Sequence, residues 1–262
     1  MVPGPPFGAG STRASGPPRL EIAIITVSRE VNYLHQTLAS LFMAEPHMHD
    51  LPPVRLLVGS PDCSYLSDLV HHRRLSVDVV PEREWSTIRD WPVQRRLGYN
   101  YWRALSTRMD AVEDLCICED DVVFRDGFMV RLRAALDEIR SREAAKYVLA
   151  AYSPYDLGDD PRWRRGRYYC ALDPTTYFGN CCTVISRALL PDAAGFVRRH
   201  TVDRLDWPVD LALGQFAARL GQSGEGGLFQ TVSSLVQHVG YVSGGTSGDY
   251  TYSPTFERAW PD

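Results

Sequence analysis

The sequence predicts a Rossmann-like α/β fold, with a mainly parallel β-sheet flanked by helices. In the first half of the chain, short apolar runs rich in β-branched residues alternate with segments of helical periodicity, which is the pattern of βαβ units. The 262 residues, 44% of them hydrophobic, are enough for one large core. The sequence shows no internal repeat, so a single domain is the simplest arrangement.

The parallel part of the sheet is expected to contain strands over residues 22–27, 54–58, 77–80 and 115–118. Each is a short apolar run, as expected for strands that are buried on both faces. Apolar residues recur every three or four positions over 34–42, 93–109, 128–139 and 207–220, which predicts helices there. Later strands are expected over 147–151, 182–185 and 235–242, with a glycine-rich loop over 221–227.

Composition limits the domain boundaries and the kinds of partner. Residues 1–19 are rich in Gly, Pro and Ser, which predicts a flexible tail. The single folded domain is therefore expected to span residues 20–262. The net charge of -4 provides no general basic field, so nucleic acid is not an expected partner. No run of about 18 apolar residues occurs, so no transmembrane segment is predicted in this chain.

The six cysteines have no zinc-knuckle or redox-motif spacing. Cys116 and Cys118 belong to a predicted strand, where they are expected to act as small apolar residues. A disulfide involving Cys170, Cys181 or Cys182 stays open.

Three consecutive acids, Glu119, Asp120 and Asp121, follow directly on the predicted strand 115–118. In open α/β sheets, ligands bind beyond the carboxyl ends of the strands. Mg²⁺ and Mn²⁺ prefer carboxylate oxygen, and a cation there would neutralise the repulsion between the acids and bridge to a diphosphate. The alternative is an acidic surface turn that only ends a strand.

Four segments, in this order, resemble the N-acetylglucosaminyltransferase IV family and the related transferase that adds N-acetylgalactosamine to GPI anchors. They are the strand and turn over 25–30 (ITVSRE) with the helix start that follows, the acidic motif over 119–122 (EDDV), the motif over 206–210 (DWPVD), and the segment over 234–240 (SLVQHVG). The resemblance spans about residues 22–243. The chain departs from the family in lacking its C-terminal domain and in being short between residues 156 and 206.

The resemblance implies a GT-A glycosyltransferase, with a C-terminal acceptor-side part, that transfers a sugar from a UDP-sugar to a hydroxyl acceptor. It implies an inverting reaction that depends on Mn²⁺ or Mg²⁺, an N-acetylhexosamine donor, and a glycan as the acceptor. The compartment stays open between the cytoplasm, if the chain is complete, and the Golgi lumen, if an N-terminal anchor preceded it.

Roles follow for the acids and for one histidine. We expect Asp121 to ligate the metal directly, and Asp120 and Glu119 to contact ribose or orient the site. The resemblance implies His238 as the second protein ligand. Direct displacement needs a carboxylate on the acceptor side, and Asp206 is our first candidate for this general base. Asp206 also lies at an apparent helix start, where Asp is a preferred cap, and Asp210 is the second candidate.

Other residues are candidates for nucleotide and sugar contacts. Thr26, Val27, Arg29 and Asp62 follow the first two strands, where the base and ribose of a nucleotide would lie in this fold. Arg95 and Arg96 open a predicted helix, either to bind phosphate or as solvated side chains. A group of aromatic residues could either form a platform for a sugar ring or simply pack in the fold. They are Tyr168, Tyr169, Tyr177 and Phe178, the last followed by Gly179 and Asn180.

Two other functions compete with glycosyl transfer. A nucleotidyltransferase also combines a nucleotide-binding sheet with acidic metal ligands, but it would normally have a glycine-rich loop after the first strand, and residues 27–33 contain no glycine. A non-catalytic carbohydrate-binding protein on the same fold is the other alternative.

Overall fold

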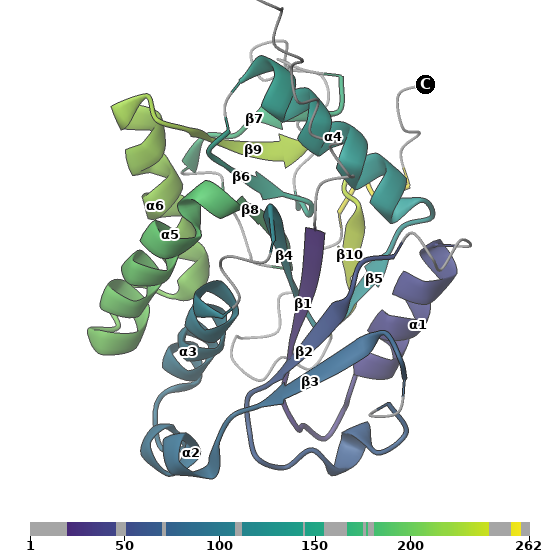
Figure 1. Ribbon diagram of the computed structural model, residues 1–262, viewed down its shortest axis with the longest axis vertical. Coiled ribbons are helices and arrows are strands. Elements are labelled where there is room, and N and C mark those ends of the chain that lie inside the picture. Colours follow the sequence, from purple (N-terminus) through teal and green to yellow (C-terminus); the bar gives the residue numbers. More distant parts are fainter. Residues whose placement is uncertain are drawn as a thin grey trace, which may run out of the picture.

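The computed structural model describes residues 20–45, 51–69, 72–107, 112–143, 145–154, 167–174, 177, 181–240 and 253–257. The expected tail over 1–19 lies outside these residues. The described strands form a large sheet of eight strands, in the order β3-β2-β1-β4-β8-β6-β9-β7, and a small sheet in which β10 pairs with β5 (Figure 1). None of the described helices is long and apolar enough to cross a membrane.

The strands are β1 (Leu20–Thr26), β2 (Val54–Val58), β3 (Leu75–Val79), β4 (Asp114–Glu119), β5 (Val122–Phe124), β6 (Tyr147–Ala150), β7 (Tyr169–Ala171), β8 (Cys182–Ser186), β9 (Gly227–Thr231) and β10 (Val236–His238). The helices are α1 (Leu34–Ala44), α2 (Glu82–Ile88), α3 (Val93–Ser106), α4 (Phe128–Arg142), α5 (Leu190–Val197) and α6 (Val209–Ser223). Short helical turns η2 (Ser64–Leu66) and η4 (Arg187–Leu189) and the π-helical η5 (Arg198–Asp203) complete the described elements.

The first half has the predicted parallel arrangement. β1 pairs in parallel with β2 and β4, and β2 pairs in parallel with β3. Helices cover both faces of the sheet (Figure 1): α1 and α4 pack into one hydrophobic cluster, and α3, α5 and α6 pack into a second on the opposite face. Because both faces are covered, β1, β2 and most of β4 are fully buried, which explains their continuous apolar sequence. The predicted mixed α/β fold is confirmed.

The second half of the sheet changes direction. β8 is antiparallel to both of its neighbours, β4 and β6, and β7 is antiparallel to β9. The antiparallel pairing of β8 with β4 brings the start of β8 beside the end of β4, where the acidic residues lie. The strand expected over 235–242 is described as Val236–His238, and residues 241 and 242 lie outside the described part.

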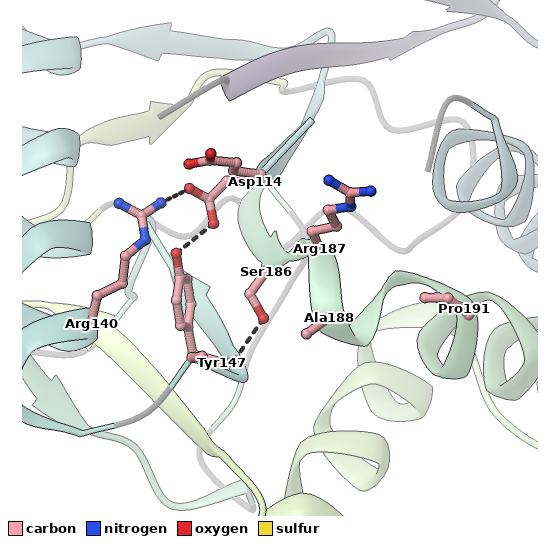
Figure 2. A pocket seen from close by; sticks show the side chains of 9 residues that line it. Asp114, Arg140, Tyr147, Ser186, Arg187, Ala188 and Pro191 are labelled. Atoms are coloured by element: carbon pink, nitrogen blue, oxygen red, sulfur yellow. Dashed lines mark hydrogen bonds and ion pairs between the residues drawn. The ribbon is translucent and has the colours of Figure 1, made fainter. Parts of the chain in front are cut away.

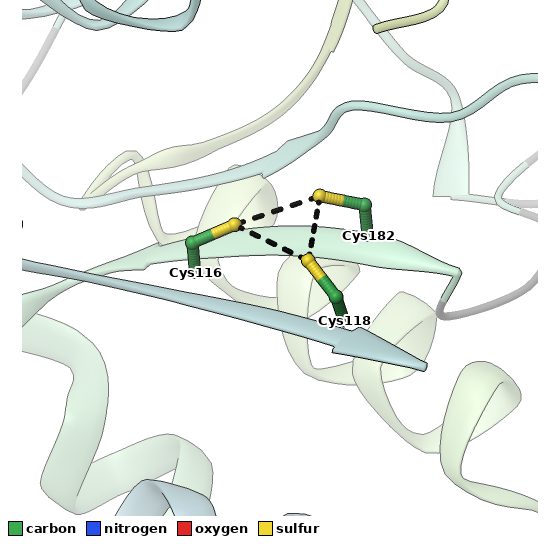
Figure 3. A group of neighbouring side chains, drawn as sticks. All are labelled: Cys116, Cys118 and Cys182. Atoms are coloured by element: carbon green, nitrogen blue, oxygen red, sulfur yellow. Dashed lines mark hydrogen bonds between the residues drawn. The ribbon is translucent and has the colours of Figure 1, made fainter. Parts of the chain in front are cut away.

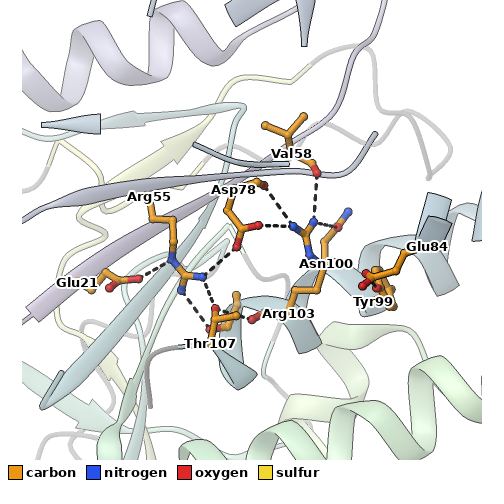
Figure 4. A network of polar contacts seen from close by, with 10 residues as sticks. Glu21, Arg55, Val58, Asp78, Glu84, Tyr99, Asn100, Arg103 and Thr107 are labelled. Carbon is orange, nitrogen blue, oxygen red and sulfur yellow. Dashed lines mark hydrogen bonds and ion pairs between the residues drawn. The ribbon is translucent and has the colours of Figure 1, made fainter. Parts of the chain in front are cut away.

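Two buried arginines hold α3 against the parallel strands (Figure 4). Arg55 on β2 donates to Glu21 Oε1 at 2.6 Å and to the carbonyl oxygen of Ala104 at 3.3 Å. Arg103 on α3 donates to the Val58 carbonyl oxygen at 3.1 Å and to Asp78 Oδ1 at 2.6 Å. Each charge therefore has a buried or half-buried carboxylate partner, as buried ions require. The network fixes the helix that packs beside the carboxyl ends of β2 and β3.

Candidate metal and nucleotide site

The acidic residues form the turn between β4 and β5, and neighbouring elements hold this turn in place. Thr26, the last residue of β1, donates from Oγ1 to Asp120 Oδ2 at 2.6 Å. Thr37 on α1 donates to the Asp120 carbonyl oxygen at 2.7 Å and accepts from the Val122 amide at 3.2 Å. Two elements thus position the acids before any ligand binds.

Arg29 neutralises part of the negative charge. Its guanidinium forms ion pairs with Asp120 Oδ1 and, at 3.5 Å, with Asp121 Oδ2. Arg29 comes from the loop after β1, as its place in the sequence predicts. The contact shows that this arginine lies at the acidic turn.

His238 reaches the same turn from the small sheet. β10 pairs with β5, and His238 Nε2 lies 3.4 Å from Asp121 Oδ2. The Val239 amide donates to the Asp121 carbonyl oxygen at 2.8 Å. A Cβ at Gly240 would lie 2.4 Å from Asp121 Oδ2, so this close approach requires glycine. The structure therefore brings Asp121 and His238 together.

The ionisation of these groups is coupled to their contacts. Burial opposes the charge on Asp121, but the hydrogen bond and charge of His238, together with Arg29, hold the pKa of Asp121 below its usual value. Burial and the negative charge of Asp121 raise the pKa of Glu119 to about 7. Burial lowers the pKa of His238, but its contact with Asp121 outweighs burial and raises it.

The donor set fits a divalent cation. Asp121 Oδ1 is buried and has no hydrogen-bond partner among the residues that the structure describes, although Asp121 Oδ2 faces both Arg29 and His238. A buried carboxylate oxygen without a partner is costly unless a ligand completes it. Glu119, Cys181 and His238 also offer donor atoms that all lie within 4.8 Å of one another.

The two candidate bases have different surroundings. Asp206 is exposed, and its Oδ2 contacts His200 Nδ1 at 2.8 Å and Arg204 Nε at 3.2 Å. Asp206 is not the cap of the helix, as its sequence position had suggested, because α6 begins at Val209 after Pro208. Trp207 packs near His200, with ring centroids 4.9 Å apart. The Asp206-Trp207 pair thus joins η5 to α6.

Asp210 lies in the first turn of α6 and is half-buried. Its negative charge is among the causes that raise the pKa values of Glu119, Tyr177 and Cys181. Asp210 is therefore within electrostatic reach of the acidic turn.

The other candidates for nucleotide contacts are distributed over two loops and a helix. Asp62 accepts from Ser28 Oγ at 3.0 Å and from Ser64 Oγ at 2.7 Å, which joins the loops that follow β1 and β2. These hydrogen bonds lower the pKa of Asp62. Val27 is half-buried beside Gly59. The Arg95 guanidinium on α3 lies 3.9 Å from the centre of the Trp91 ring and donates to the Val202 carbonyl oxygen. The next residue, Arg96, donates to the Arg89 carbonyl oxygen.

The aromatic candidates separate into two places. Tyr169 is fully buried on β7, and its hydroxyl donates to Glu143 Oε1 at 2.9 Å. The amide of Tyr168, which directly precedes β7, donates to Glu138 Oε2 on α4 at 2.9 Å, so both tyrosines contact α4 or its C-terminal end. Tyr177 is buried and contacts Thr183 Oγ1 at 2.8 Å, within reach of the charges of Glu119 and Asp210. Residues 178–180 lie outside the described part.

Sequence patterns missed Cys181, Thr37 and Gly240 as site residues. Cys181 reaches Glu119 because β8 runs antiparallel beside β4, and only an adjacent Cys-Cys pair before an apolar run marks it in the sequence. The six cysteines all lie in the described part of the chain and none forms a disulfide there, Cys170, Cys181 and Cys182 included. The sulfurs of Cys116, Cys118 and Cys182 lie 3.2–3.7 Å apart inside the hydrophobic core (Figure 3). Cys116 and Cys118 are thus buried strand residues, as predicted.

A cavity of about 520 Å³ lies at the other end of β4 (Figure 2). Asp114, Arg140, Tyr147 and Arg187 contribute to its lining. Asp114 is the first residue of β4 and Glu119 the last, so this cavity is separated from the acidic turn by the length of the strand.

Comparisons with known proteins give a weak likeness. No protein-family model matches the chain, and no curated protein sequence matches it. Among solved structures, the galactosyltransferase LgtC in complex with donor and acceptor sugar analogs is similar, with 12% identity, a TM-score of 0.48, and coverage of 79% of this chain and 72% of that one.

Proposed function

We propose that this chain is a metal-dependent glycosyltransferase that transfers a sugar from a UDP-sugar to a hydroxyl acceptor. The main support is the acidic turn after β4, where Asp121 faces His238 at 3.4 Å and has a second buried oxygen with no hydrogen-bond partner among the described residues. This turn lies at the carboxyl end of a buried parallel strand, the place where open α/β sheets bind ligands. The resemblance of four ordered segments supports the same activity.

Asp121 and His238 would hold the divalent cation, Mn²⁺ or Mg²⁺. When bound, the cation would neutralise the diphosphate that leaves with the nucleotide. Asp120 would keep the turn in place through Thr26. Arg29 pairs with both aspartates, so once a cation takes over this role its guanidinium is in position to bind phosphate oxygens.

Of the two candidate bases, Asp210 has the better surroundings. The bond from the anomeric carbon to the diphosphate breaks as the acceptor oxygen attacks from the opposite side, and a carboxylate takes the acceptor's proton. Asp206 is already engaged by His200 and Arg204. Asp210 is within electrostatic reach of Glu119 and lies in the first turn of α6, near the positive end of the helix dipole. Attack from the opposite face inverts the anomeric configuration.

The finer parts of the proposal rest on the sequence resemblance. It favours UDP as the nucleotide, an N-acetylhexosamine as the transferred sugar, and a glycan as the acceptor. Thr26, Val27 and Asp62 would line the nucleoside side, and Arg95 would contribute to the diphosphate side if its contact with Val202 opens. Tyr177 would pack near the sugar.

The test is release of UDP from a panel of UDP-sugars with Mn²⁺, with and without glycan acceptors. Activity should disappear in a chelator and return with Mn²⁺ or Mg²⁺. Asp121→Asn should lower turnover by about 100-fold or more, because a bound metal lowers the activation barrier by several kcal/mol. Asp90→Asn is the matched control, since the Asp90 side chain is 87% exposed in the turn between α2 and α3, and it should keep normal activity. Full activity in the chelator would contradict the metal role, and UDP-sugar binding without turnover would favour a carbohydrate-binding protein.

A further inference from the structure

Cys181 lies directly beside the acidic turn. It precedes β8, and the Glu119 amide donates to its carbonyl oxygen at 3.1 Å. Residues paired in this way on antiparallel strands place their side chains on the same face of the sheet. The Cys181 sulfur, a Glu119 oxygen and a His238 nitrogen accordingly lie within 4.8 Å of one another. Cys181 is 7% exposed, so it is buried but adjacent to the surface of the site.

We propose that Cys181 is a metal ligand, so that this site also binds a thiophilic cation, Zn²⁺, through Cys181, Glu119 and His238. This inference rests on the proposed metal site, and it adds a second kind of occupant with a different effect. Mn²⁺ would use Asp121 and His238 and keep open positions for the diphosphate. Zn²⁺ would use the thiolate and block turnover.

The donor set favours this choice of metal. Zn²⁺ binds thiolate, imidazole and carboxylate in tetrahedral sites, whereas Mg²⁺ prefers oxygen alone. Two donors about 2.1 Å from one Zn²⁺ are roughly 3.4 Å apart in a tetrahedral site. The donor atoms of Cys181, Glu119 and His238 lie within 4.8 Å of one another, so each pair has to close by at most about 1.4 Å to reach this separation.

His238 belongs to both donor sets. Zn²⁺ held by Cys181, Glu119 and His238 would occupy the imidazole that Mn²⁺ needs, so the two cations cannot bind at the same time. Zn²⁺ should therefore compete with Mn²⁺ and inhibit Mn²⁺-supported turnover. Binding replaces the proton of the Cys181 thiol, and the proton is released to solvent.

The surroundings of the thiol agree with this exchange. The Cys181 side chain is buried within electrostatic reach of the carboxylates of Glu119 and Asp121. A divalent cation reverses the sign of the local charge and stabilises the thiolate. The sulfur cluster of Cys116, Cys118 and Cys182 differs, since its members are at most 1% exposed, whereas Cys181 is 7% exposed.

The experiment is a titration of the full chain with Cd²⁺, a spectroscopic substitute for Zn²⁺, followed through the thiolate-to-metal absorption band. The wild type should show the band, and Cys181→Ser should lose it and bind Zn²⁺ roughly tenfold or more weakly. Affinity for Mn²⁺ should change by less than about twofold. Cys182→Ser is the control for the core cluster and should keep the band. A band that disappears in Cys182→Ser and persists in Cys181→Ser would overturn the proposal, as would no band in the wild type.

A second measurement on the wild type covers the case in which Cys181→Ser fails to fold. Zn²⁺ should slow the alkylation of Cys181, measured by peptide mass spectrometry, and leave the exposed Cys63 unaffected. Equal alkylation of Cys181 with and without Zn²⁺ would refute the assignment. Calorimetry of UDP with Mn²⁺ separates the two proposals. If Mn²⁺ strengthens UDP binding and Cd²⁺ gives no band, only the thiolate site fails; if Cd²⁺ gives the band and UDP does not bind, the glycosyltransferase proposal fails.

Discussion

Glu119, Asp120 and Asp121 are neighbours in sequence, but each has its own surroundings in the structure. Asp120 is held by Thr26 and Arg29, so its position is fixed. Asp121 faces His238, and the hydrogen bond between them helps keep its pKa low despite burial. Burial and the charge of Asp121 raise the pKa of Glu119 to about 7. Asp120 therefore anchors the turn, and Asp121 is held in the ionised form that the proposed metal-ligand role requires.

The pair Asp206 and Asp210 gives a prediction at the same scale. Asp210→Asn should lower turnover by roughly 100-fold or more, the usual scale of a positioned base, and keep binding of Mn²⁺ and UDP. Asp206→Asn should keep near-normal turnover, because the Asp206 carboxylate contacts His200 at 2.8 Å and is not the proposed base. Steady-state kinetics of both variants with one donor and acceptor decide between them. The reverse result, with Asp206→Asn inactive, would return the base to Asp206.

At the scale of elements, α1 fixes the acidic turn through one side chain. Thr37 Oγ1 donates to the Asp120 carbonyl oxygen and accepts from the Val122 amide, and the threonine is fully buried. Thr37→Val keeps the shape and leaves two buried backbone groups without their partner. The free energy of unfolding should fall by about 1–3 kcal/mol, measured by urea denaturation. Affinity for Mn²⁺ should fall as well, because the turn loses its fixed position.

The matched control for this prediction is Thr87→Val on α2. Thr87 is exposed, and its hydroxyl donates to the Arg83 carbonyl oxygen within its own helix at 3.4 Å. Its replacement should change the unfolding free energy by less than about 0.5 kcal/mol, as is usual at the surface. Equal losses in the two variants would show that α1 does not hold the turn through Thr37.

The elements that the sequence predicts well are those with a strong local pattern. β1, β2 and β4 are continuous apolar runs because helices cover both faces, and α3 and α4 have clear periodicity. β5 has only three residues, and β9 begins where the sequence predicts a glycine-rich loop. Neither strand therefore shows a periodic pattern of apolar residues in the sequence. The contacts of His238 and Cys181 with the acids depend on antiparallel pairing between distant segments, which no local pattern encodes. His238 was predicted through resemblance alone, and Cys181 was not.

At the scale of the whole molecule, β4 separates two polar groups. The acidic turn lies at its end, and Asp114 lies at its start beside the 520 Å³ cavity (Figure 2). Asp114 is 1% exposed, accepts from the Tyr147 hydroxyl and pairs with Arg140. These contacts join β4, β6 and α4. The Asp114 side chain therefore belongs to the packing of these three elements and is independent of the proposed chemistry.

Asp114 makes global stability depend on pH. Burial raises the pKa of Asp114 above its usual value of 3.8, although Tyr147 and Arg140 oppose this change. Between the unfolded and the raised folded pKa, the folded state binds more protons, so the unfolding free energy falls as pH rises through this window. Asp114→Asn has no such proton, so its unfolding free energy relative to the wild type should increase across the window. Urea denaturation at a series of pH values measures this difference.

Asp137→Asn is the control. It removes the exposed carboxylate that pairs with Arg140 at 3.1 Å, and so separates the loss of an ion pair from the loss of the buried acid. A difference between Asp114→Asn and the wild type that is constant with pH would refute the assignment.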